Sequence, residues 1–184
     1  MAEVVAFDSL GTLFDLGELE DTMQRVLHRA VSLTVSGEWA SFGDLARSVD
    51  PELPKRLAQL NAYPDTRNAL ELLRSKSKQV WVLTNGGADA THELLERNGL
   101  SDLVAEVHSV AEVKHYKPHP AVYRLLPSGA TLVAAHDWDV AGARSAGYRA
   151  IWVARRDWAL PLPEPGRGDC AESLLEAAKA AIRP

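Results

Sequence analysis

Short apolar runs rich in β-branched residues recur along the chain and predict buried strands. A strand that is covered by helices on both faces has no polar side, so its sequence is continuously apolar rather than alternating. Such runs predict strands at residues 3–7, 80–83, 104–110, 131–135 and 150–153.

Between these runs, apolar side chains repeat at the spacing of an amphipathic helix. Gly37, Gly99 and Gly147 end three of these segments, as expected for the residue that most readily takes the left-handed conformation after a helix. The proline-rich residues 160–168 predict a loop. The predicted helices occupy residues 16–35, 42–49, 66–76, 88–97, 120–126, 140–146 and 171–182, with one more short helix after Pro51.

This alternation of strand and helix predicts an α/β fold, namely a three-layer, Rossmann-like parallel sheet with helices on both faces. Residues 16–63 interrupt the alternation with helices alone, which predicts a small helical cap inserted over the sheet. The expected organisation is a core of residues 1–15 and 64–184 with a cap of residues 16–63.

Composition narrows the class of protein. At 184 residues and 46% hydrophobic, the chain can bury one apolar core without disulfides or a structural metal. The net charge of −5, without a run of basic residues, argues against nucleic-acid binding. No apolar stretch approaches the ~18 residues of a membrane span, and the run before Asp8 is too short for a signal peptide. With Cys170 as the single cysteine, these features predict a cytoplasmic protein, and they leave open whether it forms a homodimer.

Polar side chains collect where the predicted strands end. Asp8 follows the first strand, Thr84 and Asn85 follow the second, and Asp137 and Asp139 follow the fourth. Because the carboxyl ends of parallel strands meet at one edge of a sheet, where ligands bind, we expect these residues to form one site. The alternative is that each of them only ends a strand or caps a helix, as Asp139 would do for the helix at 140–146.

Lys117, in the loop before the helix at 120–126, gives this site its chemistry. A carboxylate nucleophile has to stay ionised in a partly dry pocket, where burial raises its pKa. An ammonium within ~4–6 Å lowers an Asp pKa by roughly 1–3 units and relieves the repulsion between two carboxylates. The sequence therefore predicts that Lys117 pairs with Asp8 and Asp139, with Lys114 as the fallback.

Four segments, in order along the chain, resemble the four signatures of the haloacid dehalogenase superfamily. They are residues 7–15 around Asp8, residues 83–86, residues 117–123 and residues 134–143. The resemblance spans nearly the whole chain, and it implies a hydrolase that acts through an aspartyl-ester intermediate.

Within this superfamily the chain is similar to the 2-haloacid dehalogenase branch. Phosphatases carry a proton-transferring Asp two residues after the nucleophile, where this chain has Leu10. They also carry a magnesium-binding Asp where this chain has Ala135. The third and fourth signatures likewise look like those of the metal-independent dehalogenases, so the resemblance implies no cofactor.

The resemblance implies a role for each residue of the site. Asp8 displaces halide from C2 of a small haloacid and forms an ester, and Asp139 with Lys117 nearby holds the water that hydrolyses it. The remaining residues line the pocket or bind the substrate carboxylate or a developing oxyanion. The resemblance gives Thr12, Thr84, Asn85 and Tyr123 as these substrate-binding candidates. His136 is added as a fifth although it departs from the family pattern, because it lies near Asp139 and histidine can carry a proton near neutral pH.

Two other functions stay open. One is a magnesium-dependent small-molecule phosphatase in which Asp8, Asp137 and Asp139 hold the ion. The other is a catalytically idle relative that acts as a binding or interaction protein, a hypothesis that the short cap and the substituted fourth signature motivate.

The cap raises a separate question, because many dehalogenases of this branch place an arginine early in the cap to receive the halide. This chain has Met23 at the matching position. Arg25 and Arg29 lie near it in the sequence, and either could serve the site.

Overall fold

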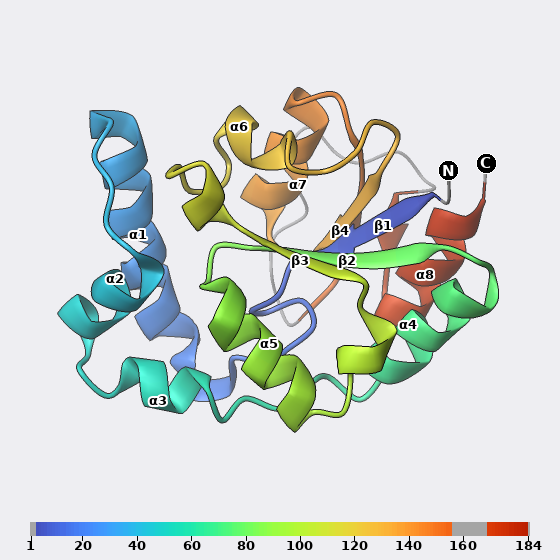
Figure 1. Cartoon of the computed structure of the whole chain (residues 1–184), viewed down its shortest axis with the longest axis horizontal. Coiled ribbons are helices and arrows are strands. Elements are labelled where there is room, and N and C mark those ends of the chain that lie inside the picture. The colour runs from blue at the N-terminus through green and yellow to red at the C-terminus, as the bar shows by residue number, and fades with distance from the viewer. Residues whose placement is uncertain (1–2, 156–168, 184) are drawn as a thin grey trace.

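Within residues 3–155 and 169–183, which the structure describes, six strands form one parallel sheet in the computed structural model (Figure 1). Their order is β3-β2-β1-β4-β5-β6, so β1 lies between β2 and β4. The residues of β1 and β4 are all buried, which explains their continuously apolar sequences. The strands are β1 (Val4–Phe7), β2 (Gln79–Thr84), β3 (Glu106–Ser109), β4 (Thr131–Ala134), β5 (Arg149–Val153) and β6 (Cys170–Ala171).

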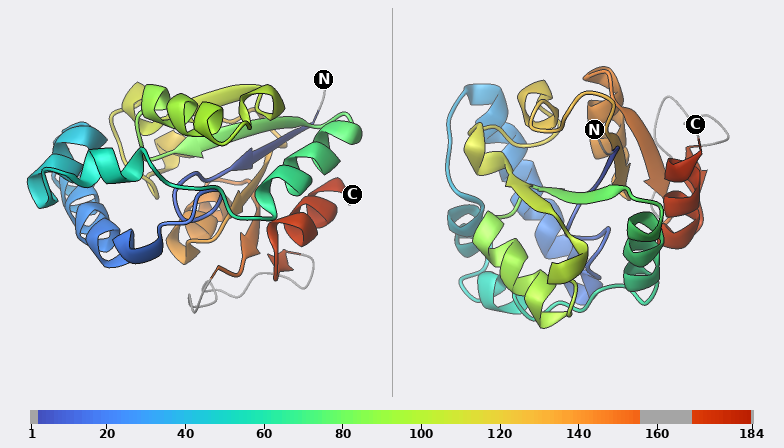
Figure 2. Two further views of the ribbon diagram at one scale, coloured as in Figure 1. Left: turned by 90° about the horizontal axis from the view of Figure 1, so that it is seen from below. Right: turned by 45° about the vertical axis from the view of Figure 1, so that its right-hand side comes forward.

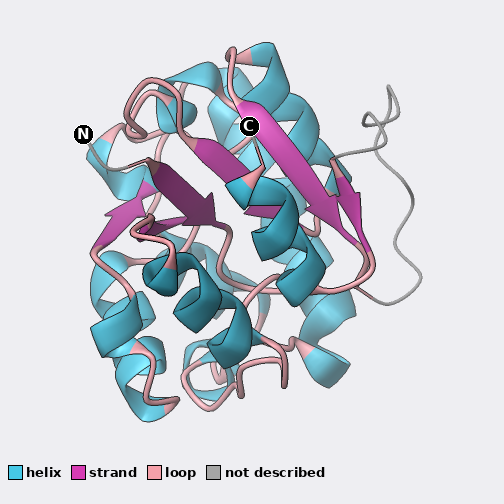
Figure 3. Cartoon of the chain, turned by 90° about the vertical axis from the view of Figure 1, so that its right-hand side faces the viewer, coloured by secondary structure: helices cyan, strands magenta, loops and turns pink. Residues whose placement is uncertain are grey.

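Helices cover both faces of this sheet (Figures 2 and 3). Helices α4, α5 and α8 lie on one side and α6 and α7 on the other, and α4 packs closely on α8. The predicted three-layer α/β fold is thereby confirmed. These elements are α4 (Thr66–Ser75), α5 (Ala88–Arg97), α6 (Pro120–Tyr123), α7 (Asp137–Ser145) and α8 (Leu174–Ile182), with the short 3-10 segments η2 (Ser101–Leu103) and η3 (Val110–Glu112).

A group of helices stands beyond the carboxyl ends of the strands, at the left of Figure 1. Gly37, at φ 74°, ends the first of them in the left-handed conformation that the sequence predicts. We propose that this group of helices is the predicted cap, which consists of residues 16–63. Its elements are η1 (Gly17–Leu19), α1 (Glu20–Ser36), α2 (Phe42–Val49) and α3 (Leu53–Leu57).

The loop after β3 fastens these helices to the core through Tyr116, which is fully buried. Its ring stacks on Trp39 with the ring centroids 5.0 Å apart. Its hydroxyl donates to the carbonyl oxygen of Ala40 at 2.9 Å, and its backbone N–H donates to the Thr34 hydroxyl at 3.1 Å. These contacts hold α1 and the segment after it over the edge of the sheet where the strands end.

Several predicted boundaries are wrong, and two of these errors concern the site and the edge of the sheet. Helix α7 begins at Asp137 with His136 at its N-cap, so Asp139 lies inside the first turn and does not cap the helix. A two-residue strand that the sequence did not predict, β6, pairs with β5, and α8 begins at Leu174 rather than at residue 171. Two residues are too few to show the periodicity of a strand. The strand β6 exists because the edge of β5 is open to pairing, and no sequence pattern signals that. The loop predicted at residues 160–168 lies outside the described residues, and no described helix is both long and apolar enough to span a bilayer.

The close packing of α7 on α6 predicts that Gly142→Ala destabilises the protein. A Cβ built at Gly142 would lie 2.6 Å from Cβ of Pro118 and would also meet the Tyr123 ring. We expect the free energy of unfolding to fall by about 1–3 kcal/mol, because overpacking outweighs the better helix propensity of Ala.

Gly43→Ala in α2 is the matched control, because a Cβ there meets nothing closer than 3.5 Å. It should be neutral or stabilising by up to ~1 kcal/mol. Urea denaturation of the two variants measures both effects, and equal losses would contradict the packing described.

Candidate active site

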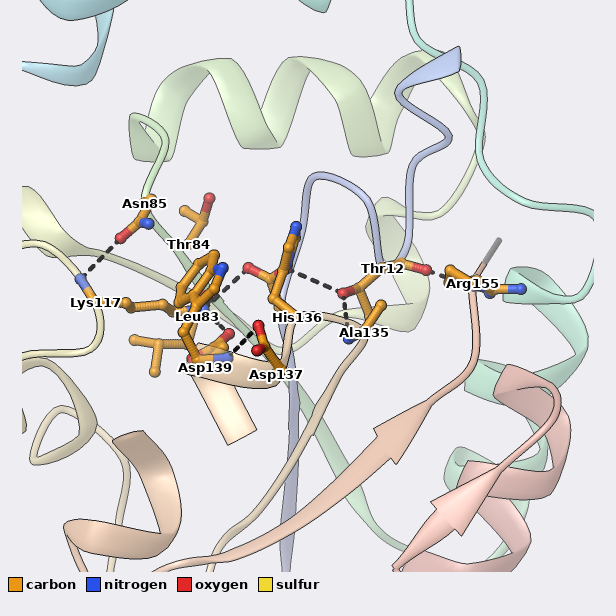
Figure 4. A network of polar contacts seen from close by, with 12 residues as sticks. Thr12, Leu83, Thr84, Asn85, Lys117, Ala135, His136, Asp137, Asp139 and Arg155 are labelled. Atoms are coloured by element: carbon orange, nitrogen blue, oxygen red, sulfur yellow. Dashed lines mark hydrogen bonds and ion pairs between the residues drawn. The ribbon is translucent and has the colours of Figure 1, made fainter. Parts of the chain in front are cut away.

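Asp8 lies directly after β1, at the centre of the sheet, and is almost entirely buried. The backbone turns sharply after it, since Gly11 has a φ of 82° that favours glycine. This turn brings the Thr12 hydroxyl back to the carboxylate, where it donates to Oδ2 at 3.0 Å. The same hydroxyl accepts from the backbone N–H of Ala135 at 3.0 Å, which ties the turn after β1 to the end of β4 (Figure 4).

The Lys117 ammonium joins three segments that are far apart in the sequence. Its Nζ donates to Oδ1 of Asp8 at 3.0 Å, to Oδ2 of Asp139 at 2.7 Å and to the carbonyl oxygen of Leu83 at 2.7 Å. The side chain is 0% exposed. An ammonium has three hydrogens, so each of them has a partner here. The fallback, Lys114, is exposed and does not take part.

Asp139 comes from the first turn of α7 and is fully buried. Its Oδ1 accepts from the Tyr123 hydroxyl at 2.8 Å, and its Oδ2 accepts from Lys117. Tyr123 is also fully buried. The two carboxylates therefore share one ammonium but differ in their other partners.

This difference separates the pKa values of the two carboxyls. Burial alone would raise the pKa of Asp8, but the Lys117 ammonium and the His136 ring hold it well below its ordinary value. Burial raises the pKa of Asp139, and the negative charge of Asp8 raises it further. The Lys117 ammonium and the Tyr123 hydroxyl lower this pKa, but the net shift is upward. Burial also disfavours the Lys117 ammonium, but the two carboxylates raise its pKa above the ordinary value. Asp8 is thus the carboxyl that ionises first.

A narrow pocket, with a cavity volume of about 20 Å³, opens on Asp8 between the core and the cap. His136 stands in its wall with Nδ1 3.1 Å from Oδ2 of Asp8, and its ring stacks on Trp138. Asn85 also lines it, while its Oδ1 accepts from the backbone N–H of Lys117 at 3.0 Å. The pocket lining consists of Asp8, Leu10, Leu16, Glu20, Met23, Leu27, Phe42, Thr84, Asn85, Gly86, His136 and Trp138.

A second, mostly apolar cavity of about 170 Å³ adjoins this pocket. The two share Leu10, Phe42, Thr84 and Gly86, and the second lies between the cap and α5.

The five candidate substrate-binding residues fall into two groups. Thr84, Asn85 and His136 line the pocket, although the Thr84 hydroxyl also accepts from the backbone N–H of Gly86 at 2.9 Å. Thr12 and Tyr123 do not line it, because their hydroxyls lie beneath the carboxylates and bind Asp8 and Asp139.

The cap contributes residues that sequence reasoning did not single out for the pocket. Arg25 and Arg29 are exposed on α1 and bind the side chains of Thr22 and Ser48, so among the described residues no arginine lines the pocket. Glu20 lines it instead. The sequence alone carries no signal for this, because the inward face of α1 depends on how the cap packs.

The residues proposed for a magnesium ion do not fit one. The Lys117 ammonium sits within hydrogen-bonding distance of both Asp8 and Asp139, where a bridging cation would lie. Asp137 is exposed and accepts from the backbone N–H of Trp138. Among the described residues, no group of three His, Cys, Asp or Glu side chains could hold a metal ion.

Comparison with known families agrees with this geometry. The model of the haloacid dehalogenase-like hydrolase family matches residues 19–153. The chain belongs to this family. The predicted superfamily is thereby confirmed, and the protein is a hydrolase of the haloacid dehalogenase-like family.

The relatives of this hydrolase include several dehalogenases. It is 26% identical over 196 residues to haloacetate dehalogenase H-2 of Moraxella sp. (strain B), a match that covers 85% of this chain and 88% of that protein. It is 28% identical over 191 residues to (S)-2-haloacid dehalogenase 1 of Pseudomonas sp. (strain CBS-3), covering 81% and 83%. The structure of L-2-haloacid dehalogenase from Xanthobacter autotrophicus with chloropropionic acid covalently bound has the same fold, with a TM-score of 0.84, 21% identity and coverage of 97% and 98%.

The shared ammonium predicts that Lys117→Met is strongly destabilising. It would leave two buried carboxylates facing each other, and breaking a buried ion pair in this way costs about 3–5 kcal/mol. The pKa values of Asp8 and Asp139 in the folded variant would rise. The loss of stability is therefore full when both carboxyls are ionised, and it shrinks as they take up protons. The difference in unfolding free energy from wild type should therefore grow from acidic to neutral pH in urea denaturation.

Lys114→Met, at an exposed position of the same loop, is the control and should change stability by less than ~0.5 kcal/mol. A Lys117→Met variant as stable as this control at neutral pH would refute the proposed electrostatic role of Lys117.

Proposed function

We propose that this hydrolase is a 2-haloacid dehalogenase-like enzyme that releases halide from a small 2-halo carboxylic acid through an ester on Asp8, without a metal. The observation that carries the proposal is that the buried Asp8 carboxylate is held ionised by Lys117 and faces the pocket. The dehalogenase names of the relatives support it.

The first step uses Asp8 as the nucleophile. One carboxylate oxygen attacks C2 of the acid, a C–O bond forms, and the carbon–halogen bond breaks as the halide leaves with the bonding electron pair. The lowered pKa keeps Asp8 charged, and the Thr12 hydroxyl fixes the orientation of its carboxylate. Asn85 and His136 are the polar groups on the pocket wall that would bind the substrate carboxylate or the departing halide.

The second step returns Asp8 to its starting state. Water attacks the ester carbonyl, the acyl C–O bond breaks, and the departing alkoxide takes up the proton that was removed from the water, so that the 2-hydroxy acid leaves. The remaining proton of the water is lost to solvent from the new Asp8 carboxyl, whose lowered pKa favours the carboxylate. Asp139 is the group proposed to take the proton from this water, because it is the neighbouring carboxylate that stays free while Asp8 is esterified, and burial raises its pKa. Lys117 stabilises the negative charge that develops on the carbonyl oxygen, and Tyr123 keeps Asp139 in place.

The phosphatase alternative has less support. Leu10 lines the pocket where a phosphatase needs an acid, and a hydrocarbon side chain transfers no proton. The side chains around Asp8 do not suit magnesium, as described above.

We predict chloride release from 2-chloropropionate in the presence of excess chelator, measured with a chloride electrode. Asp8→Asn should abolish the release, because an amide at this position cannot form the ester. Asp137→Asn is the control, since this side chain is exposed, and it should keep close to the wild-type rate.

Each other outcome identifies a different function. Hydrolysis of a chromogenic phosphate that requires magnesium and is lost in Asp137→Asn would indicate the phosphatase. No turnover of any haloacid or phosphate, with Asp8→Asn indistinguishable from wild type, would indicate the idle binding protein.

The separated pKa values predict that acid blocks the second step before the first. As the pH falls, Asp139 takes up a proton first because its pKa is raised, while Asp8 stays ionised because its pKa is lowered. Halide release at acidic pH should then stop after one equivalent per enzyme, with the ester accumulating on Asp8. Asp139→Asn should show the same single burst at neutral pH. Rapid-quench mass spectrometry of the Asp8 peptide measures the ester, and parallel loss of both steps on acidification would contradict this assignment.

A further inference from the structure

Glu20, the first residue of α1, places a carboxylate in the pocket that contains Asp8. Its Oε2 is buried and has no hydrogen-bond partner. Its Oε1 has one long contact, 3.5 Å from Nε2 of Gln24. A buried polar oxygen without a partner is destabilising, so a site of this kind is completed when a ligand supplies the donor.

Helix stability alone does not explain why this side chain faces the pocket. An acidic residue in the first turn of a helix is favourable wherever it points, because it complements the helix dipole. Asp21, also in the first turn of α1, and Glu18 just before it are both exposed. An outward-facing Glu20 would serve the dipole as these two do.

The one basic side chain described in the wall of this pocket, His136, has its Nδ1 at the Asp8 carboxylate rather than at Glu20. Among the described residues, neither lysine nor arginine lines the pocket, and all three hydrogens of the buried Lys117 ammonium are already bonded. Asp8 is the other carboxylate in the pocket wall. A simple haloacid anion therefore enters a pocket whose acidic groups repel it, whereas a positively charged group on the substrate would be attracted.

We propose that Glu20 binds an ammonium group of the substrate, so that this site prefers zwitterionic 2-halo acids over simple alkyl ones. This inference rests on the proposed function, because Asp8 is taken to attack C2 of the same molecule. The substrate carboxylate would lie at Asn85 and His136, and its amino-bearing chain would reach across the pocket to Glu20. Glu20 is thus the specificity-determining residue contributed by the cap.

The test compares substrates that differ only in the charged group. 4-Amino-2-chlorobutyrate is paired with 2-chloropentanoate, and 6-amino-2-chlorohexanoate with 2-chloroheptanoate. In the wild type, kcat/KM should be on the order of 10- to 100-fold higher for the amino member of at least one pair, as for a hydrogen bond between charged groups. Glu20→Gln, which keeps the shape, should bring this ratio close to one through a rise in KM, and should raise kcat/KM for 2-chloropropionate.

Glu18→Gln removes the same charge two residues away on an exposed side chain, and it should leave the ratio unchanged. Equal ratios in wild type and Glu20→Gln would overturn the proposal. So would an equal loss of kcat/KM on every substrate in Glu20→Gln, since Glu20 would then serve the reaction itself or the fold.

A binding measurement separates failure of this inference from failure of the proposed function. Calorimetry with 4-aminobutyrate and pentanoate needs no turnover, and it should show tighter binding of the amino acid to wild type that is lost in Glu20→Gln. Halide release that depends on Asp8, combined with no such difference in binding, refutes only the role of Glu20. A charge-dependent difference in binding without any halide release refutes the dehalogenase and keeps the ammonium site.

Discussion

One buried ammonium constrains the rest of this structure. A charge removed from water is tolerated only when every polar contact it loses is replaced, and Lys117 replaces them with oxygens from β2, from the turn after β1 and from α7. The sheet order supplies these partners, because β1 lies between β2 and β4 and all three strands end at the same edge. The catalytic proposal and the fold thus depend on the same three hydrogen bonds.

The two carboxylates that share this ammonium are not equivalent. Asp8 reaches the pocket and has the Thr12 hydroxyl and the His136 ring as further partners, which keep it charged. Asp139 is fully enclosed, with Tyr123 as its second partner, and burial favours its protonated form. Two neighbouring carboxyls can act as nucleophile and as proton acceptor only if their pKa values differ, and their different surroundings cause that difference. The division of labour in the proposed mechanism follows from this asymmetry.

Sequence patterns predicted the parts of the structure that follow from strand and helix periodicity. Buried strands have apolar sequences, and the polar residues after them meet because parallel strands share an edge, which is why Asp8, Lys117 and Asp139 could be expected together. Side-chain direction could not be obtained in this way. Tyr123 points to Asp139 rather than into the pocket, and Glu20 turns inward from the cap, because both directions are set by packing between elements. Strand β6 was missed for a similar reason, since its pairing depends on the free edge of β5.

The central claim is that water attacks an ester on Asp8 rather than the halogenated carbon. A single turnover of 2-chloropropionate with excess enzyme in water enriched in heavy oxygen tests this most directly. The account predicts that the heavy oxygen enters the Asp8 carboxyl, found in its peptide by mass spectrometry, and that the 2-hydroxy acid leaves unlabelled. Heavy oxygen in the product of the first turnover, with an unlabelled Asp8 peptide, would contradict it.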